Sequence, residues 1–329
     1  MSANISIFVP HLGCPHRCSF CDQNAITGEN HEPRPEDVRK TVEKGLPYIK
    51  NPDDAEIAFF GGSFTAIDRE YMTDLLGAAC EYVRDGRVSG IRISTRPDAV
   101  DDEILDILKK YRVKAIELGA QSMDKNVLTK NLRGHTAERV VQASRLIKEK
   151  GFELGLQMMT GLYASSEKSD RETAEQLAEL CPKTVRIYPA VTLKDTLLYR
   201  LYNSGEYQPP SLEQSVKLCA DLLEFFEQRD IRVIKLGLHA SREVEDAYAA
   251  GPYHPAFREL CEGRIYLKRA VKALGGQKGD FTLYVKKTEI SKMVGQSKCN
   301  VKALEQMGCR CRIKSRDGIE KYSVVAEKE

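Results

Sequence analysis

The sequence has no tryptophan and no apolar run approaching the roughly 20 residues that a membrane-spanning helix needs. Its first ten residues lack the basic segment and apolar stretch of a secretory signal. The formal net charge is only +2 over 329 residues, so overall charge does not indicate a partner. These absences argue against a membrane protein and a disulfide-rich secreted one. They predict a cytoplasmic chain whose thiols stay reduced.

The ten cysteines are unevenly distributed along the chain. Three of them, Cys14, Cys18 and Cys21, lie within eight residues, directly after the strand-like run Ile5–Val9. Spacing decides whether reduced cysteines are packing residues or metal ligands, and this spacing indicates a metal centre. The others are scattered, and we interpret them as packing residues: Cys80, Cys181, Cys219, Cys261, Cys299, Cys309 and Cys311.

Two metal centres could use three closely spaced thiolates. A mononuclear zinc site usually takes four ligands, so zinc would need His11, His16 or a distant residue as well. Three cysteines on a [4Fe–4S] cluster leave one iron open to a substrate or cofactor. The spacing favours the cluster over zinc.

The cysteine motif resembles that of the radical S-adenosylmethionine (SAM) superfamily. The family signature is CxxxCxxC after the first barrel strand, with an aromatic residue before the last cysteine; Cys14, Cys18, Phe20 and Cys21 match it. The resemblance implies a [4Fe–4S] cluster that binds SAM and cleaves it reductively. The resulting 5′-deoxyadenosyl radical would abstract hydrogen from a substrate. An electron donor such as flavodoxin or ferredoxin is then expected as a partner.

Short apolar runs alternate with helical patterns over the first 190 residues. The predicted strands are Ile5–Val9, Glu56–Phe60, Gly90–Ser94, Lys114–Gly119, Glu153–Met159 and Thr184–Tyr188. The predicted helices between them are Pro35–Tyr48, Asp68–Arg84, Asp101–Lys110, Thr136–Lys150 and Ser169–Leu180. Beyond residue 190 the pattern predicts helices near Asp195–Ser204 and over Leu212–Arg229, and a strand at Arg232–Leu236. Six such βα units predict an α/β protein with a partial (βα)6 TIM-type barrel, followed by a small α+β domain. Chemistry in such barrels gathers at the carboxyl ends of the strands.

Polar and glycine residues follow several of these strands. A Gly61-Gly62 pair lets the backbone approach a ligand closely, although a tight turn would also explain it. Arg96 can meet a carboxylate, and a buried Gln121 needs polar partners. With the resemblance, the residues expected to bind SAM are Phe20, Gly61, Gly62, Ser63, Thr95, Arg96 and Gln121. Arg186 and Tyr188, at the sixth strand, are the candidates for the substrate side.

Further segments are similar to one branch of this superfamily. ISTRPD, ELGAQS, RGHT and MTGL resemble the family of Elongator catalytic subunits, which modify the wobble uridine of tRNA. The similarity extends from residue 5 to about residue 240, and a weaker one links the chain to oxygen-independent coproporphyrinogen oxidases. The sequence has no counterpart of the acetyltransferase domain of the Elongator family. The radical machinery is therefore expected here, and the carboxymethylated product is not.

The C-terminal segment differs in charge from the rest of the chain. Residues 280–329 hold eleven Lys and Arg against seven Asp and Glu, whereas the preceding residues are slightly acidic. The segment resembles a KH module, in which a GxxG loop between two helices clamps nucleic-acid backbone. The loop would be 295–298, with Gly295, Lys298 and Lys302 as RNA contacts. A strand over Cys309–Lys314, a turn at Asp317-Gly318 and a last strand ending at Val325 are predicted to follow. A solvated surface would also explain the charge.

The sequence thus predicts three parts: a radical SAM barrel (1–240), a helical extension and linker (241–276), and a small basic domain (277–329). The leading hypothesis is a radical SAM enzyme that acts on RNA, with tRNA preferred. One alternative is a radical SAM enzyme for a peptide or small metabolite, with the tail as an auxiliary domain. The other is a zinc-bound, non-enzymatic RNA-binding protein. The sequence carries no signal for the product or the oligomeric state.

Overall fold

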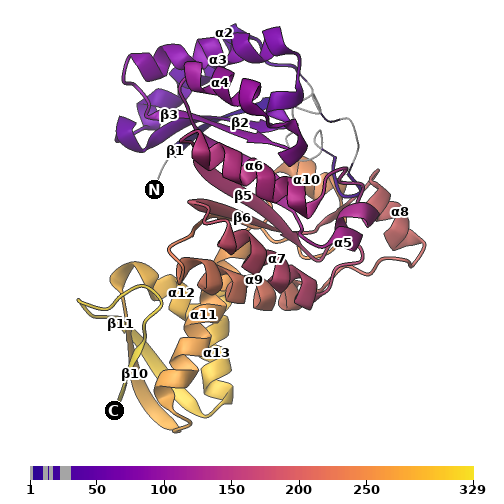
Figure 1. Ribbon diagram of the computed structural model, residues 1–329. Coiled ribbons are helices and arrows are strands. Elements are labelled where there is room, and N and C mark those ends of the chain that lie inside the picture. The colour runs from indigo at the N-terminus through magenta and orange to yellow at the C-terminus, as the bar shows by residue number, and fades with distance from the viewer. Residues whose placement is uncertain (1–2, 10–13, 15–17, 23–30) are drawn as a thin grey trace.

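A computed structural model describes residues 3–9, 14, 18–22 and 31–329. Its centre is a curled, parallel, seven-stranded sheet whose strands follow one another in chain order (Figure 1). The strands are β1 (Ala3–Val9), β2 (Ala55–Gly61), β3 (Gly90–Thr95), β4 (Val113–Gln121), β5 (Glu153–Thr160), β6 (Thr184–Pro189) and β8 (Arg232–Leu236). All six of these strands are present, and β8, which matches the strand predicted at Arg232–Leu236, extends the same sheet. The expected α/β partial barrel is confirmed.

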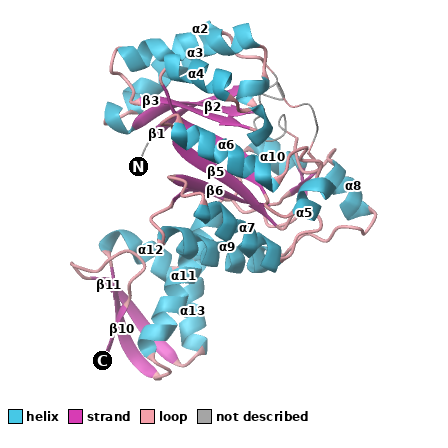
Figure 2. Ribbon diagram, in the orientation of Figure 1, coloured by secondary structure: helices cyan, strands magenta, loops and turns pink. Residues whose placement is uncertain are grey.

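Helices pack on the outer face of this sheet, as Figure 2 shows. They are α2 (Pro35–Gly45), α3 (Arg69–Arg84), α4 (Asp102–Lys110), α6 (Ala137–Glu149), α7 (Glu167–Glu179) and α9 (Leu212–Glu227). Alternate strand residues such as Ile57, Phe59 and Ile93 point toward these helices and join one large apolar core. Several of these helices begin at a residue whose side chain caps the first turn. The Asp101 carboxylate at the start of α4, for example, accepts a hydrogen bond from the N–H of Ile104 at 2.8 Å.

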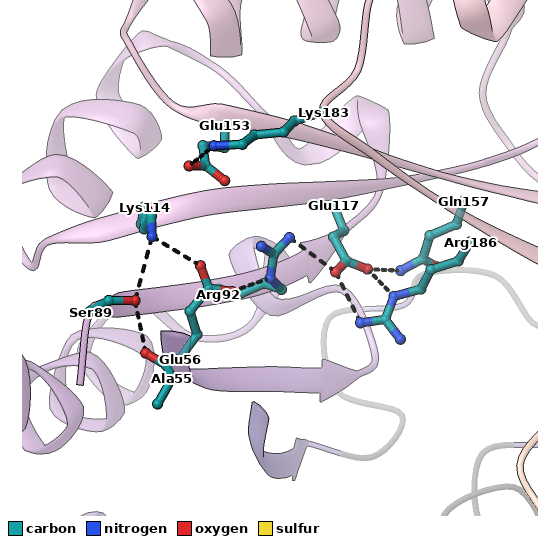
Figure 3. A network of polar contacts seen from close by, with 10 residues as sticks. All are labelled: Ala55, Glu56, Ser89, Arg92, Lys114, Glu117, Glu153, Gln157, Lys183 and Arg186. Atoms are coloured by element: carbon teal, nitrogen blue, oxygen red, sulfur yellow. Dashed lines mark hydrogen bonds and ion pairs between the residues drawn. The ribbon is translucent and has the colours of Figure 1, made fainter. Parts of the chain in front are cut away.

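The inner face of the sheet carries buried charges instead (Figure 3). The carboxylate of Glu117 lies between two arginines, at 3.3 Å from Arg92 Nη1 and 2.5 Å from Arg186 Nε. Arg92 Nε also donates to Glu56 at 2.6 Å, and Gln157 Nε2 donates to Glu117 at 2.9 Å. Buried charges are tolerated when they are paired and hydrogen-bonded in this way. The network joins β2 through β6 across the interior.

Short elements that the sequence did not predict lie beyond the strand ends. Helix α5 (Lys125–Lys130) follows β4. Strands β7 (Thr192–Leu193) and β9 (Tyr248–Ala250) form a separate antiparallel pair. Helix α10 (Arg242–Ala247) precedes β9. Helix α8 (Leu197–Asn203), in contrast, corresponds to the helix predicted near Asp195–Ser204 and is shorter than expected. Strands of two or three residues and helices of six carry too little periodicity to be recognised from sequence.

A long helix, α11 (Phe257–Leu274), connects the barrel to the C-terminal part of the chain. Its first half contributes Phe257, Cys261 and Ile265 to the barrel core. Its second half contributes Tyr266 and other apolar residues to a second, smaller core. The helix expected as a separate extension therefore belongs to both cores.

The second core lies between α11, two short helices and a small mixed sheet. The helices are α12 (Ile290–Val294) and α13 (Cys299–Gln306), and the strands are β10 (Gly279–Val285), β11 (Cys309–Ser315) and β12 (Val325–Lys328). The central strand β10 pairs in parallel with β11 and antiparallel with β12. The last strand was expected to end at Val325, and that was wrong, since it begins there. Residues 316–324 instead fold back against the barrel, where Lys321 pairs with Glu227 at 3.0 Å.

Among the residues described, no helix is both long and apolar enough to cross a membrane.

The network predicts a large loss of stability when Glu117 is removed. In Glu117→Ala, Arg92 and Arg186 would share a buried site with only Glu56 to compensate them. We expect a fall in the free energy of unfolding of about 3–5 kcal/mol, measured by urea denaturation. The control is Glu153→Gln, which breaks the exposed pair with Lys183 and should cost less than about 1 kcal/mol. Equal losses in the two variants would contradict this prediction.

Candidate functional site

A cavity of about 330 Å³ opens at the carboxyl ends of the first strands. Its lining contains all ten residues predicted for the cluster and for SAM: Cys14, Cys18, Phe20, Cys21, Gly61, Gly62, Ser63, Thr95, Arg96 and Gln121. Ser94, Gly119, Arg133 and Gln157 complete it. The parallel topology explains this convergence, because all these strands end at the same edge of the sheet.

The glycine pair after β2 holds two strand ends together. Gly61 has a φ of +115°, and a Cβ there would lie 2.6 Å from the carbonyl oxygen of Val9. The next N–H, from Gly62, donates to that same oxygen at 2.8 Å. Only glycine combines this backbone conformation with so close an approach. Gly61 therefore brings the end of β2 against β1, from which the cysteine loop departs.

Three hydroxyl groups beneath the cavity bond to one another. The Thr95 hydroxyl lies 2.9 Å from that of Ser63 and 2.6 Å from that of Thr65. Ser63 also accepts from the N–H of Arg96 at 3.1 Å. Both Ser63 and Thr95 were predicted to contact SAM, and both line the cavity. The hydrogen bonds of these two hydroxyls hold the loop after β2 against the loop after β3.

Three polar groups in the cavity wall remain without partners in the described part of the chain. Arg96 makes a two-point contact with Asp98 at 2.9 and 2.8 Å, but its Nη1 atom is buried and unpaired. The same is true of Gln121 Oε1 and Arg133 Nε. Buried polar atoms are costly unless they are hydrogen-bonded. Two guanidinium donors and one amide acceptor fit a ligand that carries a carboxylate and an amino group, as SAM does.

Arg133 was not predicted as a site residue. Its Nη1 atom donates to Cys18 Sγ at 2.9 Å and its Nη2 atom to the carbonyl of Gly119 at 2.6 Å. Its guanidinium also lies 5.9 Å from the centre of the Phe20 ring. Arg133 belongs to the RGHT segment, one of the segments that resemble the Elongator family. That resemblance was the signal by which the sequence could have identified Arg133 as a site residue. The contact itself joins residues 115 positions apart and has no sequence pattern.

The three thiols face this cavity from the loop after β1. Burial and the neighbouring Cys18 and Cys14 raise the pKa of Cys21 to about 12, and burial also raises the pKa of Cys14. No three His, Cys, Asp or Glu side chains among the described residues converge in the arrangement of a bound metal. His11 and His16, considered as zinc ligands, lie outside the described residues. The donor set still fits a thiolate-ligated cluster, since three sulfurs and a cationic Arg133 line one cavity.

A second cavity, of about 360 Å³, adjoins the first. The two share six lining residues: Phe20, Cys21, Gly61, Ser94, Gln121 and Gln157. Arg186 and Tyr188, predicted for the substrate side, line only the second. The Arg186 guanidinium is held by Glu117 and lies 4.6 Å from the centre of the Phe60 ring. Burial raises the pKa of Tyr188, which keeps its hydroxyl protonated.

The predicted RNA-binding residues lie apart from both cavities, in the C-terminal domain. Gly295 has a φ of +75°, and a Cβ there would come within 2.6 Å of Cys299 Sγ. Lys298 stands where a GxxG loop has its second glycine and adopts the left-handed conformation, with a φ of +61°. Lys302 is exposed on α13. In Figure 1 this domain (yellow) lies away from α5 and α8 at the strand ends.

A parallel half-barrel with three thiols and a polar cavity at its mouth is the arrangement expected of a SAM-dependent iron–sulfur enzyme. Sequence comparison agrees. The family model described as the radical SAM superfamily matches residues 8–177. The model for the radical SAM C-terminal domain matches residues 182–267. The chain belongs to the radical SAM superfamily. Membership supports an enzyme rather than the non-enzymatic zinc alternative.

Two relatives and one solved structure are similar to this chain over most of its length. An uncharacterised protein of Methanocaldococcus jannaschii is 31% identical over 66% of this chain and 65% of its own. The tRNA uridine(34) acetyltransferase of the same organism is 24% identical over 66% of this chain and 48% of its own. The chain therefore spans about half the length of that tRNA-modifying relative. The solved structure of Methanocaldococcus infernus Elp3 covers 81% of this chain and 63% of its own, with 20% identity and a TM-score of 0.65.

Replacing any one of the three clustered cysteines should prevent cluster assembly. After anaerobic reconstitution we expect the wild-type chain to be brown, with about four irons per chain. Cys14→Ala, Cys18→Ala and Cys21→Ala should bind little iron and lose the visible absorbance. Cys299→Ser changes an exposed thiol in the C-terminal domain and should reconstitute normally. Wild-type protein that binds one zinc and stays colourless would contradict the prediction.

Arg133 should contribute to SAM binding. In Arg133→Met the side-chain volume is roughly kept, but the buried charge beside Cys18 and the unpaired Nε donor are lost. A hydrogen bond to a charged group is worth about 1.5–3 kcal/mol, so affinity for SAM should fall about tenfold or more in equilibrium dialysis. Arg145→Met, on an exposed position of α6, is the matched control. Unchanged SAM affinity in Arg133→Met would rule out this role.

Proposed function

We propose that this chain is a radical SAM enzyme that modifies a nucleotide of RNA, with uridine in tRNA as the leading candidate. The observation that carries the proposal is the convergence of ten predicted cofactor residues on one cavity at the mouth of the half-barrel. The similarity to tRNA uridine(34) acetyltransferases supports the choice of substrate. Because the chain covers about half of those relatives, their acetyl transfer is not carried over.

Cys14, Cys18 and Cys21 would ligate a [4Fe–4S] cluster, and the fourth iron would bind SAM. The cluster, once reduced by a donor such as flavodoxin or ferredoxin, would supply the electron that cleaves SAM into methionine and a 5′-deoxyadenosyl radical, and this radical would abstract hydrogen from the substrate. Gly61 and Gly62 bring backbone close to the ligand, while Phe20 provides an apolar wall. Arg96, Arg133 and Gln121 offer the unpaired polar atoms that would orient the amino-acid part of SAM. The remaining predicted residues, Ser63 and Thr95, support these loops.

The adjoining cavity would hold the reacting nucleotide. Phe8, Phe60 and Tyr188 line it with aromatic rings, on which a flipped base can stack. Because this cavity shares its wall with the SAM cavity, a base there would lie next to the cofactor. The protein's part in the reaction is to position the substrate hydrogen and to exclude water. Arg186, neutralised by Glu117, would act mainly as a rigid wall and hydrogen-bond donor.

The C-terminal domain, residues 277–329, would bind RNA backbone outside the cavities. Its support is a helix–loop–helix segment with exposed lysines, in which Lys298 adopts the left-handed backbone conformation that glycine favours. Anchored to the barrel through α11, the domain would hold the RNA at a set position relative to the barrel mouth. The proposed division into 1–240, 241–276 and 277–329 follows this separation of roles.

The substrate can be tested on the nucleosides of cellular tRNA. Mass spectrometry of tRNA from cells with and without the gene should reveal one modified nucleoside that depends on the gene. Complementation with the wild-type gene should restore it, and the Cys18→Ala variant should not. Unchanged tRNA nucleosides, with intact SAM cleavage by the purified protein, would redirect the proposal to a peptide or a small metabolite.

The C-terminal lysines should contribute to RNA affinity through charge alone. Lys298→Glu combined with Lys302→Glu should weaken tRNA binding and flatten its salt dependence by about one logarithmic unit of slope per lysine. Filter binding over a range of salt concentrations measures both effects. Lys168→Glu, at an exposed site on α7 of the barrel, should change neither. An unchanged slope in the double variant would show that the domain does not bind RNA through this loop.

A further inference from the structure

Two basic residues stand side by side on the inner face of the sheet. Arg186 on β6 and Lys235 on β8 are register partners. Neighbouring strands lie about 4.8 Å apart, so the two cations start from adjacent positions. The pairing of β6 with β8 shifts register between Val185 and Arg186. Val233, which lies on the other side of this shift, joins the apolar core under the helices. Lys235 instead lines the second cavity, together with Arg186 and Tyr188.

The carboxylates described on this face are all paired with cations other than Lys235. Glu56 pairs with Arg92 and Lys114, and Glu117 pairs with Arg92 and Arg186. Both buried carboxylates are therefore engaged. In the described part of the chain, no carboxylate lies within ion-pair distance of Lys235.

The surroundings of Lys235 disfavour its charge. Burial lowers the pKa of Lys235, and the neighbouring cations Arg186 and Arg258 lower it further. Arg258 itself is held by Glu262 at 3.1 Å and donates to the carbonyl of Val233 at 2.8 Å, so it is fixed in place. A partly buried cation without a counter-charge is unfavourable. An anion from outside the protein would relieve this cost.

The residues that line the second cavity also favour binding of an anion there. Of the described residues that line it, none is acidic, and its other side chains are mainly aromatic, aliphatic or uncharged. Lys235 does not line the cavity assigned to SAM. The charge surplus therefore faces the space assigned to the substrate rather than the carboxylate of SAM.

We infer that Lys235 is a substrate-binding residue that holds an oxyanion, a phosphate or a carboxylate, in the second cavity. The inference rests on the proposed function only in naming a nucleotide as the molecule that carries this group. A backbone phosphate beside a stacked base and a carboxylate on the base both provide the same chemistry. A lysine suits either, because its ammonium acts as a point charge without a required geometry.

The oxyanion can be tested without knowledge of the substrate. Reductive methylation of the cluster-loaded full chain, read by peptide mass spectrometry, reports how accessible each lysine is. Inorganic phosphate, acetate or both should protect Lys235, while exposed Lys168 is modified as before. Protection by phosphate alone identifies a phosphate source, protection by acetate alone identifies a carboxylate, and protection by both supports an oxyanion site that accepts either group. Protection by neither anion overturns the inference, whether or not RNA is the substrate.

Affinity measurements then connect the site to nucleotides. We expect uridine 5′-phosphate or 5-carboxyuridine to bind at least tenfold more tightly than uridine in the presence of SAM. Lys235→Met should abolish this preference, and Lys235→Arg should retain part of it. If the anions protect Lys235 but none of the three uridine compounds binds, the oxyanion site stands and the nucleotide proposal falls. An equal preference in Lys235→Met and wild type would overturn the inference.

Stability separates binding from a structural role. Lys235→Met removes a cation that lies next to Arg186 and has no carboxylate partner among the described residues. Its thermal midpoint should therefore equal or exceed that of the wild type, while its anion preference is lost. A clear decrease in the midpoint would show that Lys235 supports the fold instead.

Discussion

The buried carboxylate of Glu117 is the interaction on which the interior of the half-barrel depends. It joins Arg92 on β3 to Arg186 on β6, while Gln157 bonds to it from β5 (Figure 3). A curled sheet with helices on its outer face must fill its inner face by other means, and here it uses paired charges. Because the two arginines are neutralised from within, the strands can close around a polar space. Because Glu117 is paired with Arg92 and Arg186, it does not pair with Lys235, which lines the second cavity.

The barrel mouth combines two kinds of polar group. Ser63, Thr95 and Thr65 satisfy one another and hold the loops in place. Arg96 and Arg133 are anchored through some of their atoms and leave others unpaired, and Gln121 Oε1 is also unpaired in the described part of the chain. An interior that leaves buried donors and acceptors unpaired is costly for a fold alone. The arrangement is reasonable when a polar ligand completes it, as membership of the radical SAM superfamily implies.

Sequence reasoning succeeded where a pattern is local. The strands were located because apolar runs bounded by turn residues recur along the chain, and the cavity residues because each follows such a strand. It failed for α5, β7 and β9, which are short, and for the last strand, where residues 316–324 fold back on the barrel. Arg133 and Lys235 were overlooked as site residues because their significance comes from neighbours distant in sequence.

The sequence by itself determined the class of chemistry and the order of the strands. Three cysteines at a set spacing predict a metal centre, and a repeated βα pattern permits few topologies. Only the tertiary structure decided how the charges are distributed around the cavities. It placed Arg133 beside Cys18, gave Glu117 to Arg92 and Arg186, and left Lys235 facing the second cavity. Strand register and sheet curvature bring these groups together, and neither is written in the spacing of any one segment.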